Sequence, residues 1–441
     1  MSLYGTAIER LALVLGDRAL RTEYVATLRR WRRIQHLPAE ELRRLQHDGL
    51  RELLEYATTT VPYHRAGAAA RHDDPYEWLR RLPVMTKHDL RDSVDELVVG
   101  DRSRLVASPS SGSSGIQSTV YMTPREVSRT QAYQTLLWEW AGYRLGTPLL
   151  QTGMTPDRGA VKAVKDRLLR TTYVPAFGLD DEDALEVITG RGARRSRHFG
   201  GYASSLYVVA RAASSAGIDQ HFDSVISWGD KMFPEYRSLI ERTFRTKVYD
   251  TYGTTEGLVI AGQRDVEQYY VLSPHVVVEL LDDEDRPVPD GELGRVVVTR
   301  LDSRAMPLIR YSLGDLAIAA EASAQAELGF PVLERIVGRD TDIVETPSGR
   351  HLIVHTFTGI FEFFTQIQQF RVVQEHRDGI TVEYIPGDGF QPGVLTALEQ
   401  RLREIVREPF AIDWTEVDHI PSTPSGKPQI VASTLARRSR R

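Results

Sequence analysis

The spacing of apolar residues predicts a helical beginning, followed by alternating strands and helices. Leucines recur near helical spacing from Leu42 to Leu54, behind Pro38, a residue suited to a first helical turn. Between residues 105 and 255, short apolar runs alternate with amphipathic stretches. They predict strands at 105–108, 148–153, 172–176, 224–228 and 247–251, and helices at 125–141, 182–189, 202–215 and 234–244. This alternation favours a parallel-rich sheet with helices packed outside it.

From residue 268 onward, the pattern changes to short apolar runs separated by turns. The runs at 276–278, 296–298 and 316–318 predict antiparallel strands or a small barrel. The stretch 340–441 has its own α+β pattern, with strands expected at 351–354, 370–375 and 380–385 and helices at 356–364 and 393–406. We therefore predict an α/β protein. Its large domain, 101–339, combines parallel-rich sheets and helices with a small β subdomain; it is preceded by a helical lead at 1–100 and followed by a small α+β domain at 340–441.

Composition removes several classes of function. The chain has 441 residues, enough for two or three domains, and a formal net charge of −5 that is mixed along its length. This gives no basic surface for nucleic acid or an anionic membrane, and we interpret the tail Arg437–Arg441 as a solvated end. The chain has no cysteine, which excludes disulfides, a thiolate nucleophile and a cysteine zinc site. Because no secretory signal and no long apolar run is present, we expect a soluble, cytoplasmic protein without membrane contact.

A glycine- and hydroxyl-rich stretch is the first candidate for chemistry. It consists of Ser111, Gly112, Ser113, Ser114 and Gly115, and it follows the predicted strand 105–108. Glycines let backbone N–H groups approach phosphate oxygens, and small hydroxyls add donors without bulk. A flexible linker has a similar composition, and no Gly-Lys-Ser/Thr ends the stretch as in a Walker loop.

A second stretch, Tyr252-Gly253-Thr254-Thr255-Glu256, follows the predicted strand 247–251. Ligands of open α/β sheets bind outside the carboxyl ends of the strands, which is where this stretch is expected. Glu256 could ligate Mg²⁺ with help from the Thr255 hydroxyl, and the ring of Tyr252 could stack on a base. An ordinary polar turn is the alternative.

Two further candidates complete the series. Asp315 follows the glycine turn at Gly314 and could accept both hydroxyls of a ribose, although Gly-Asp also occurs in surface turns. Lys427 lies in the turn Ser425-Gly426-Lys427 and could neutralise charge that develops at a phosphate, although a solvated lysine is the ordinary alternative.

Together with Gly338-Arg339, these motifs resemble, in order and approximate spacing, those of the adenylate-forming superfamily. The resemblance covers about residues 30–430 and is closest to the phenylacetate-CoA ligase-like branch, which includes proteins named after capsule biosynthesis. Segments at 200–206 and 228–231 also resemble this branch. Members form an acyl-adenylate from a carboxylic acid and ATP, release pyrophosphate, and then rotate a small, mobile C-terminal domain to make a thioester.

The resemblance implies a role for each motif. Residues 111–115 would hold the β- and γ-phosphates of ATP, and Thr255 and Glu256 would serve Mg²⁺ and the α-phosphate. Asp315 and Arg339 would bind the ribose, and Lys427 would act only in the adenylating orientation. The adenine site would consist of Gly229, Asp230, Tyr252, Gly253 and Thr254, and the pocket for an aryl or short acyl acid would be bordered by Phe177, Phe199, Tyr202 and Trp228.

Some positions depart from the family pattern and leave the second substrate open. Family phosphate loops usually carry a lysine soon after the last glycine, whereas this chain has Ile116, Gln117 and Ser118. The position two past Arg339, the usual hinge, is Thr341. We therefore expect transfer of the acyl group to CoA, with an amine, a hydroxyl or a carrier-protein thiol as alternative acceptors. A catalytically silent nucleotide-binding relative is a third hypothesis. Relatives occur as monomers and dimers, and the sequence does not distinguish these states.

Overall fold

The computed structural model divides into two compact units. It describes residues 3–433 except 110–117, 154–158, 177–178, 255, 266, 283, 321–326, 338–343, 349, 353, 362, 365, 388 and 421–429. The first unit contains residues 1–108, 120–176 and 181–338, and the second contains 109–119, 177–180 and 339–441.

The first unit begins with helices, as the leucine spacing predicts. They are α1 (Leu3–Ala7), η1 (Ile8–Ala12), α2 (Leu13–Leu20), α3 (Tyr24–Ile34), α4 (Ala39–Thr60), η2 (Pro62–Ala70), α5 (Pro75–Arg80), α6 (Lys87–Asp92), α7 (Val94–Leu97) and η3 (Arg102–Arg104). The longest, α4, buries Leu42, Leu50, Leu53 and Leu54 on one face. The short strands β1 (Val106–Pro109) and β2 (Thr119–Met122) follow and pair with each other.

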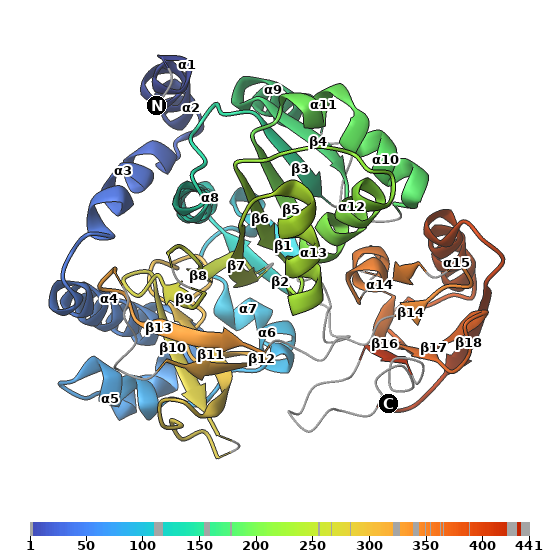
Figure 1. Ribbon diagram of the computed structural model, residues 1–441. Coiled ribbons are helices and arrows are strands. Elements are labelled where there is room, and N and C mark those ends of the chain that lie inside the picture. The colour runs from blue at the N-terminus through green and yellow to red at the C-terminus, as the bar shows by residue number, and fades with distance from the viewer. Residues whose placement is uncertain are drawn as a thin grey trace. The chain divides into compact units, whose positions relative to one another are not determined.

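A parallel sheet forms the centre of this unit. Its strands are β3 (Leu149–Gly153), β4 (Thr171–Pro175), β5 (His198–Tyr202), β6 (Ser224–Trp228) and β7 (Val248–Thr254), in the order β4-β3-β5-β6-β7. Helix α8 (Pro124–Trp140) precedes these strands, and the helices between them are α9 (Gly159–Leu169), α10 (Asp181–Thr189), α11 (Arg191–Arg195), α12 (Ala203–Ser215) and α13 (Pro234–Phe244). Helices α12 and α13 pack against β5, β6 and β7 (Figure 1). This confirms the predicted parallel sheet with outer helices.

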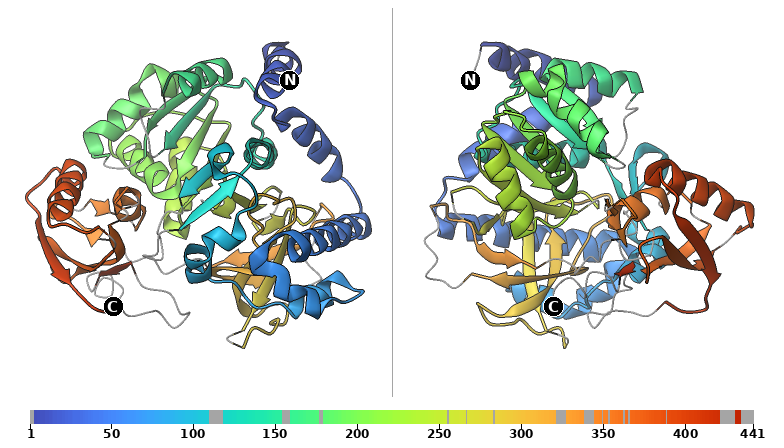
Figure 2. Two further views of the ribbon diagram at one scale, coloured as in Figure 1. Left: turned by 180° about the vertical axis from the view of Figure 1, so that it is seen from behind. Right: turned by 45° about the vertical axis from the view of Figure 1, so that its right-hand side comes forward.

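Antiparallel strands extend the same sheet beyond β7. They are β8 (Leu258–Gly262), β9 (Tyr269–Val271), β10 (Val276–Leu281), β11 (Leu293–Arg300), β12 (Tyr311–Ala319) and β13 (Val332–Ile336), in the order β7-β8-β9-β13-β12-β11-β10. Figure 2 shows these strands, yellow to orange, beside the blue helix α4. Their apolar side chains form a core with β2, which includes Met122, Ile260, Val298 and Tyr311.

The second unit has a mixed sheet in the order β18-β17-β16-β19. Its elements are β14 (Val344–Glu345), β15 (His351–Leu352), α14 (Val354–Phe361), β16 (Ile367–Gln374), β17 (Gly379–Pro386), α15 (Gly393–Val406), β18 (Ala411–Glu416) and β19 (Val431–Ser433). A core of its own includes Phe361, Phe370, Val382 and Leu398. The predicted α+β character of this region is therefore confirmed.

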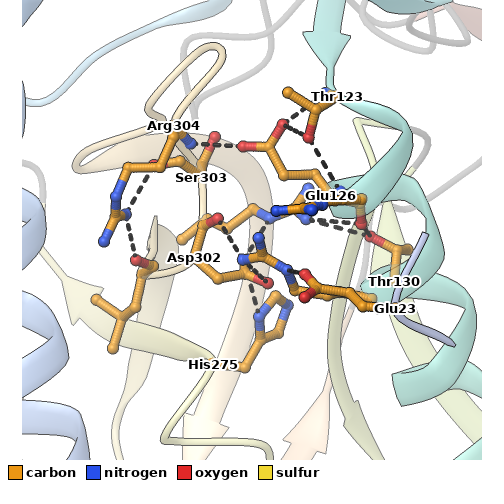
Figure 3. Close-up of polar contacts among 12 residues, drawn as sticks. Glu23, Thr123, Glu126, Thr130, His275, Asp302, Ser303 and Arg304 are labelled. Atoms are coloured by element: carbon orange, nitrogen blue, oxygen red, sulfur yellow. Dashed lines mark hydrogen bonds and ion pairs between the residues drawn. The ribbon is translucent and has the colours of Figure 1, made fainter. Parts of the chain in front are cut away.

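A buried polar network ties helix α8 to the end of β11 (Figure 3). Asp302 accepts a hydrogen bond from Arg300 Nε at 2.8 Å and one from the Tyr133 hydroxyl at 2.9 Å, and its Oδ1 lies 3.3 Å from His275 Nδ1. Although burial alone would raise the pKa of Asp302, Arg300 and His275 hold that pKa well below its usual range. Glu126 joins the network from α8. These contacts between several elements fix the position of α8 against the sheet.

None of the helices in the described part of the chain combines the length and the apolar character that a membrane span requires.

Candidate functional site

Two of the predicted motifs meet through a pair of tyrosines. Tyr252 on β7 donates its hydroxyl to Asp315 Oδ2 at 2.8 Å. Conversely, Tyr311 lies on β12, and its hydroxyl is 3.3 Å from Oε1 of Glu256, which follows β7. Three strands separate β7 from β12 in the sheet order, so the antiparallel part of the sheet must curl to bring them together. The structure thus places Glu256 and Asp315 at one site near the end of β7.

The backbone at the end of β7 is irregular, and glycine makes this possible. The pairing with β8 shifts register between Tyr252 and Gly253. A Cβ atom on Gly253 would lie only 2.4 Å from the carbonyl oxygen of Leu258, so this position requires glycine. The next side chain, Thr254, has a buried hydroxyl with no hydrogen-bond partner among the described residues. A buried polar atom of this kind is a natural contact for a ligand.

Glu256 is a buried carboxylate, with 4% of its surface exposed. The Lys87 ammonium lies 3.6 Å from its Oε1 atom, and the side chain of Lys87 is 8% exposed. The site therefore contains a buried ion pair beside the tyrosine contact. A carboxylate at the end of a parallel strand has the position and chemistry to contact a ligand-borne cation.

The turn after β6 supports the neighbouring helix. Gly229 has φ +86°, and a Cβ atom there would lie 2.4 Å from the ring of Tyr202. The carboxylate of Asp230 accepts backbone N–H groups of Ala203 and, at 3.1 Å, Ser204, the first residues of α12. Burial raises the pKa of Asp230 to about 7, even though these two donors favour the charged form. The Asp230 side chain thus holds the turn against α12.

Aromatic rings lie over glycines near the ends of β5 and β6. A Cβ atom on Gly200 would lie 2.8 Å from the ring of Trp228, which itself stacks on Trp138 with ring centroids 5.4 Å apart. The indole N–H of Trp138 is buried without a hydrogen-bond partner in the described structure. Phe199 lies elsewhere: it is fully buried against Phe222 and Phe244, with centroids 5.3 and 5.9 Å away. These contacts are those of a core residue.

Several predicted site residues lie outside the described residues. They are the phosphate-loop residues Ser111, Gly112, Ser113, Ser114 and Gly115, together with Phe177, Thr255, Arg339 and Lys427. Their roles remain predictions.

The chain was compared with known proteins. No family model matches it. Protein CapK of Staphylococcus aureus is 22% identical over 379 residues, which cover 81% of this chain and 80% of the relative. The phenylacetate-coenzyme A ligase of Thermus thermophilus is 25% identical over 330 residues (70% of this chain, 73% of the relative), and that of Escherichia coli is 25% identical over 336 residues (70% and 74%).

Solved structures share the fold over nearly the whole chain. A crystal structure of 2-hydroxyisobutyryl-CoA ligase, with 2-HIB-AMP and CoA in the thioesterification state, gives a TM-score of 0.62 at 18% identity. The match covers 92% of this chain and 93% of that one. The chain is thus similar to proteins of the adenylate-forming superfamily, in its phenylacetate-CoA ligase-like branch. An open conformation of the same ligase gives a TM-score of 0.57 at 19% identity, covering 90% and 92% of the two chains.

The sequence motifs assigned no role to two residues of the candidate site, Tyr311 and Lys87. Tyr311 lies only four positions before Asp315, and its place on the same strand is the signal that could have found it. Lys87 opens a short helix far from the other motifs, and no spacing rule connects it to Glu256. Only the folded chain brings Lys87 to the site.

Proposed function

We propose that this protein is an ATP-dependent carboxylate-activating ligase that forms an acyl-adenylate and passes the acyl group to the thiol of CoA. The observation that carries the proposal is the meeting of Glu256 and Asp315 through Tyr311 and Tyr252 at the carboxyl end of β7. Two acids held at one strand end can serve two parts of one nucleotide, its phosphates and its ribose. The similarity to the phenylacetate-coenzyme A ligases supports this proposal.

In the first half-reaction, an oxygen of the substrate carboxylate attacks the α-phosphorus of ATP. The new O–P bond replaces the bond to the β-phosphate bridge, and pyrophosphate leaves. A weak anionic nucleophile must approach an anionic phosphate, so the protein has to supply positive charge and fixed geometry. We assign the ribose to Asp315, the β- and γ-phosphates to residues 111–115, and the compensating charge to Lys427, with Arg339 assisting at the ribose. Tyr252 and the 229–230 turn would border the adenine.

The residues at the end of β7 fit a magnesium ion that arrives on ATP. Mg²⁺ commonly uses one or two carboxylates together with substrate phosphates, so Glu256 is sufficient on the protein side. The buried Thr254 hydroxyl, which has no hydrogen-bond partner among the described residues, supports this assignment. We assign Glu256 and Thr255 as the residues that would hold the ion. When bound, it neutralises phosphate charge.

In the second half-reaction, the CoA sulfur attacks the acyl carbon and AMP leaves with the carboxyl oxygen, while the thiol proton passes to solvent. We infer that residues 101–339 bind ATP and the acyl group and that residues 340–441 act as a mobile lid between the two steps. We also infer that the reaction takes place in the cytoplasm.

For the acid itself, we propose an aryl or short acyl group that contacts Tyr202 and Trp228. The ring of Trp228 stacks on Trp138 and lies close to Gly200. These contacts hold the ring in one position near the strand ends. The buried indole N–H of Trp138, which has no hydrogen-bond partner in the part of the chain that the structure describes, supports this proposal as a further donor.

Exchange of labelled pyrophosphate into ATP across a broad panel of carboxylic acids tests the first half-reaction. We expect acid-dependent exchange for one class of acids, and AMP release that then depends on CoA. Amines and carrier proteins serve as competing acceptors. Exchange without CoA-dependent AMP release would exclude CoA as the acceptor, and no exchange with any acid would contradict the proposal as a whole.

A further inference from the structure

The position of Lys87 is imposed by contacts of its neighbours with strand β12. Met85 forms a two-way backbone pair with this strand: its N–H donates to the Arg310 carbonyl at 2.9 Å, and its carbonyl accepts from the Ser312 N–H at 2.9 Å. The buried guanidinium of Arg310 also donates to the carbonyl of Leu82 at 2.7 Å. The segment that precedes α6 is therefore fastened directly beside Tyr311. This explains how a residue of the N-terminal helices reaches Glu256.

Lys87 is an unfavourable residue at this place by local criteria. It is the first residue of α6, after the N-cap Thr86, where the partial positive charge of a helix start disfavours another cation. Its side chain is also almost fully buried, and burial of an ammonium carries a large desolvation cost. Residues that contradict local rules tend to mark functional positions. The compensating feature is Glu256, 3.6 Å from the ammonium.

A buried ion pair is a poor device for stability, because well-packed apolar residues of similar volume are often at least as stabilising. It is a good device for holding a carboxylate in one orientation. Lys87 and Tyr311 both approach the same oxygen, Oε1 of Glu256, at 3.6 and 3.3 Å. The ion pair with Lys87 and the hydrogen bond from Tyr311 act on one oxygen, so together they restrict the rotation of the carboxylate and direct its other oxygen.

We propose that Lys87 is a positioning residue of the nucleotide site, which orients the Glu256 carboxylate for the magnesium ion carried by ATP. This rests on the proposed function, since it assigns Lys87 to the same site. Positioning residues around metal ligands commonly change metal affinity by about 10- to 100-fold when they are replaced. Through Lys87, the N-terminal helical segment would contribute a residue to the nucleotide site at the end of β7.

The test combines binding and activity in purified full-length variants. Lys87→Met removes the ammonium and keeps the apolar stem, Lys87→Arg keeps the charge, and Lys247→Met is a matched control at an exposed lysine. We expect Lys87→Met to weaken Mg·ATP binding about 10-fold in calorimetry and to raise the half-saturating Mg²⁺ concentration of pyrophosphate exchange similarly. Lys87→Arg should recover most of the binding, and Lys247→Met should match the parent protein. Unchanged Mg·ATP binding in a folded Lys87→Met protein would overturn the proposal.

A double variant tests whether Lys87 acts through Glu256. If it does, Lys87→Met should add less than about twofold to the effect of Glu256→Gln on Mg·ATP binding, because coupled residues are not additive. The double variant also leaves no unpaired buried charge from this ion pair. It should therefore fold even where Lys87→Met does not. A further large loss in the double variant would contradict action through Glu256. Because calorimetry needs no turnover, a protein that binds Mg·ATP but shows no exchange would contradict the proposed function and leave the role of Lys87 measurable.

Discussion

Two groups of buried charges in the first unit differ in how closely their carboxylates are held. In the network of Figure 3, Glu126 Oε1 accepts the backbone N–H groups of Arg304 and Ala305 at 2.5 and 3.1 Å. At the candidate site, Glu256 Oε1 lies 3.3 Å from the Tyr311 hydroxyl and 3.6 Å from the Lys87 ammonium. Short hydrogen bonds from several elements lock a fold, whereas long contacts at a site commonly tighten when substrate binds. The two carboxylates therefore differ in what holds them: backbone N–H groups contact Glu126 in the network, whereas the side chains of Tyr311 and Lys87 approach Glu256 at the candidate site.

The largest effect is expected when the structural network is broken. Asp302→Asn would leave Arg300, which is 1% exposed, without its compensating charge. We expect the free energy of unfolding to fall by about 3–5 kcal/mol, measured by denaturant titration. Asp290→Asn, at an exposed turn, is the control and should change stability by less than about 0.5 kcal/mol. A loss below about 1 kcal/mol for Asp302→Asn would mean that the network does not hold the fold.

The largest effect on catalysis is expected at Lys427. If it supplies the charge for adenylation alone, Lys427→Ala should slow adenylate formation by ~10²-fold or more. Thioester formation from a supplied acyl-adenylate should stay nearly intact, and so should stability, in contrast to Asp302→Asn. Single-turnover measurements of each half-reaction check this, with Lys247→Ala as the control. Equal losses in both half-reactions would show that the assigned role is wrong.

The fold was predictable where side-chain patterns are strong and elements are long. The apolar run at 224–228 and the amphipathic stretches at 234–244 and 393–406 coincide with β6, α13 and α15. The pattern did not reveal β9, Tyr269–Val271, because three residues are too few for a period. It also missed β13 and β18, because their sequences, VLERI and AIDWTE, contain no strict alternation of apolar and polar residues and no continuous apolar run.

The site was predictable only in part, because motifs report local chemistry and not the approach of distant segments. Short sequence motifs pointed to Glu256 and Asp315, and contacts with Tyr311 and Tyr252 bring these two acids together. Lys87 reaches them through backbone pairing of Met85 with β12, which no local pattern encodes. Residue type alone did not place Phe199 either: it was expected to border the acyl pocket, and its ring contacts Phe222 and Phe244 in the core.

The stability that the network of Figure 3 provides should also depend on pH, through His275. Burial lowers the pKa of His275 below 6.5, so as the pH falls below about 6.5 the unfolded chain binds a proton that the folded chain does not. Stability should therefore decline between pH 7 and pH 5.5, with on the order of 1 kcal/mol from this residue. Asp302, with its pKa lowered, adds stability that is lost only at much more acidic pH. Denaturant titrations of the parent protein and of His275→Asn across this range check the contribution, and an equal pH slope in both would contradict it.

A matched pair of tyrosines gives the finest test of the comparison. Tyr133 donates to Asp302 Oδ2 at 2.9 Å, and Tyr252 donates to Asp315 Oδ2 at 2.8 Å. Phenylalanine at either position removes one hydroxyl from a carboxylate and keeps the ring. We expect Tyr252→Phe to raise the KM for ATP about fivefold, close to 1 kcal/mol, with little change in unfolding, because Asp315 loses its orientation towards the ribose.

Tyr133→Phe should do the opposite. It should lower the free energy of unfolding by about 1 kcal/mol or more and leave the KM for ATP within about twofold. The two variants differ in where the hydrogen bond lies and not in its chemistry, so each serves as the control for the other. If both variants changed stability alone, Tyr252 and Asp315 would be part of the scaffold, and the distinction between the structural network and the candidate site would fail at the residue pair on which the site depends.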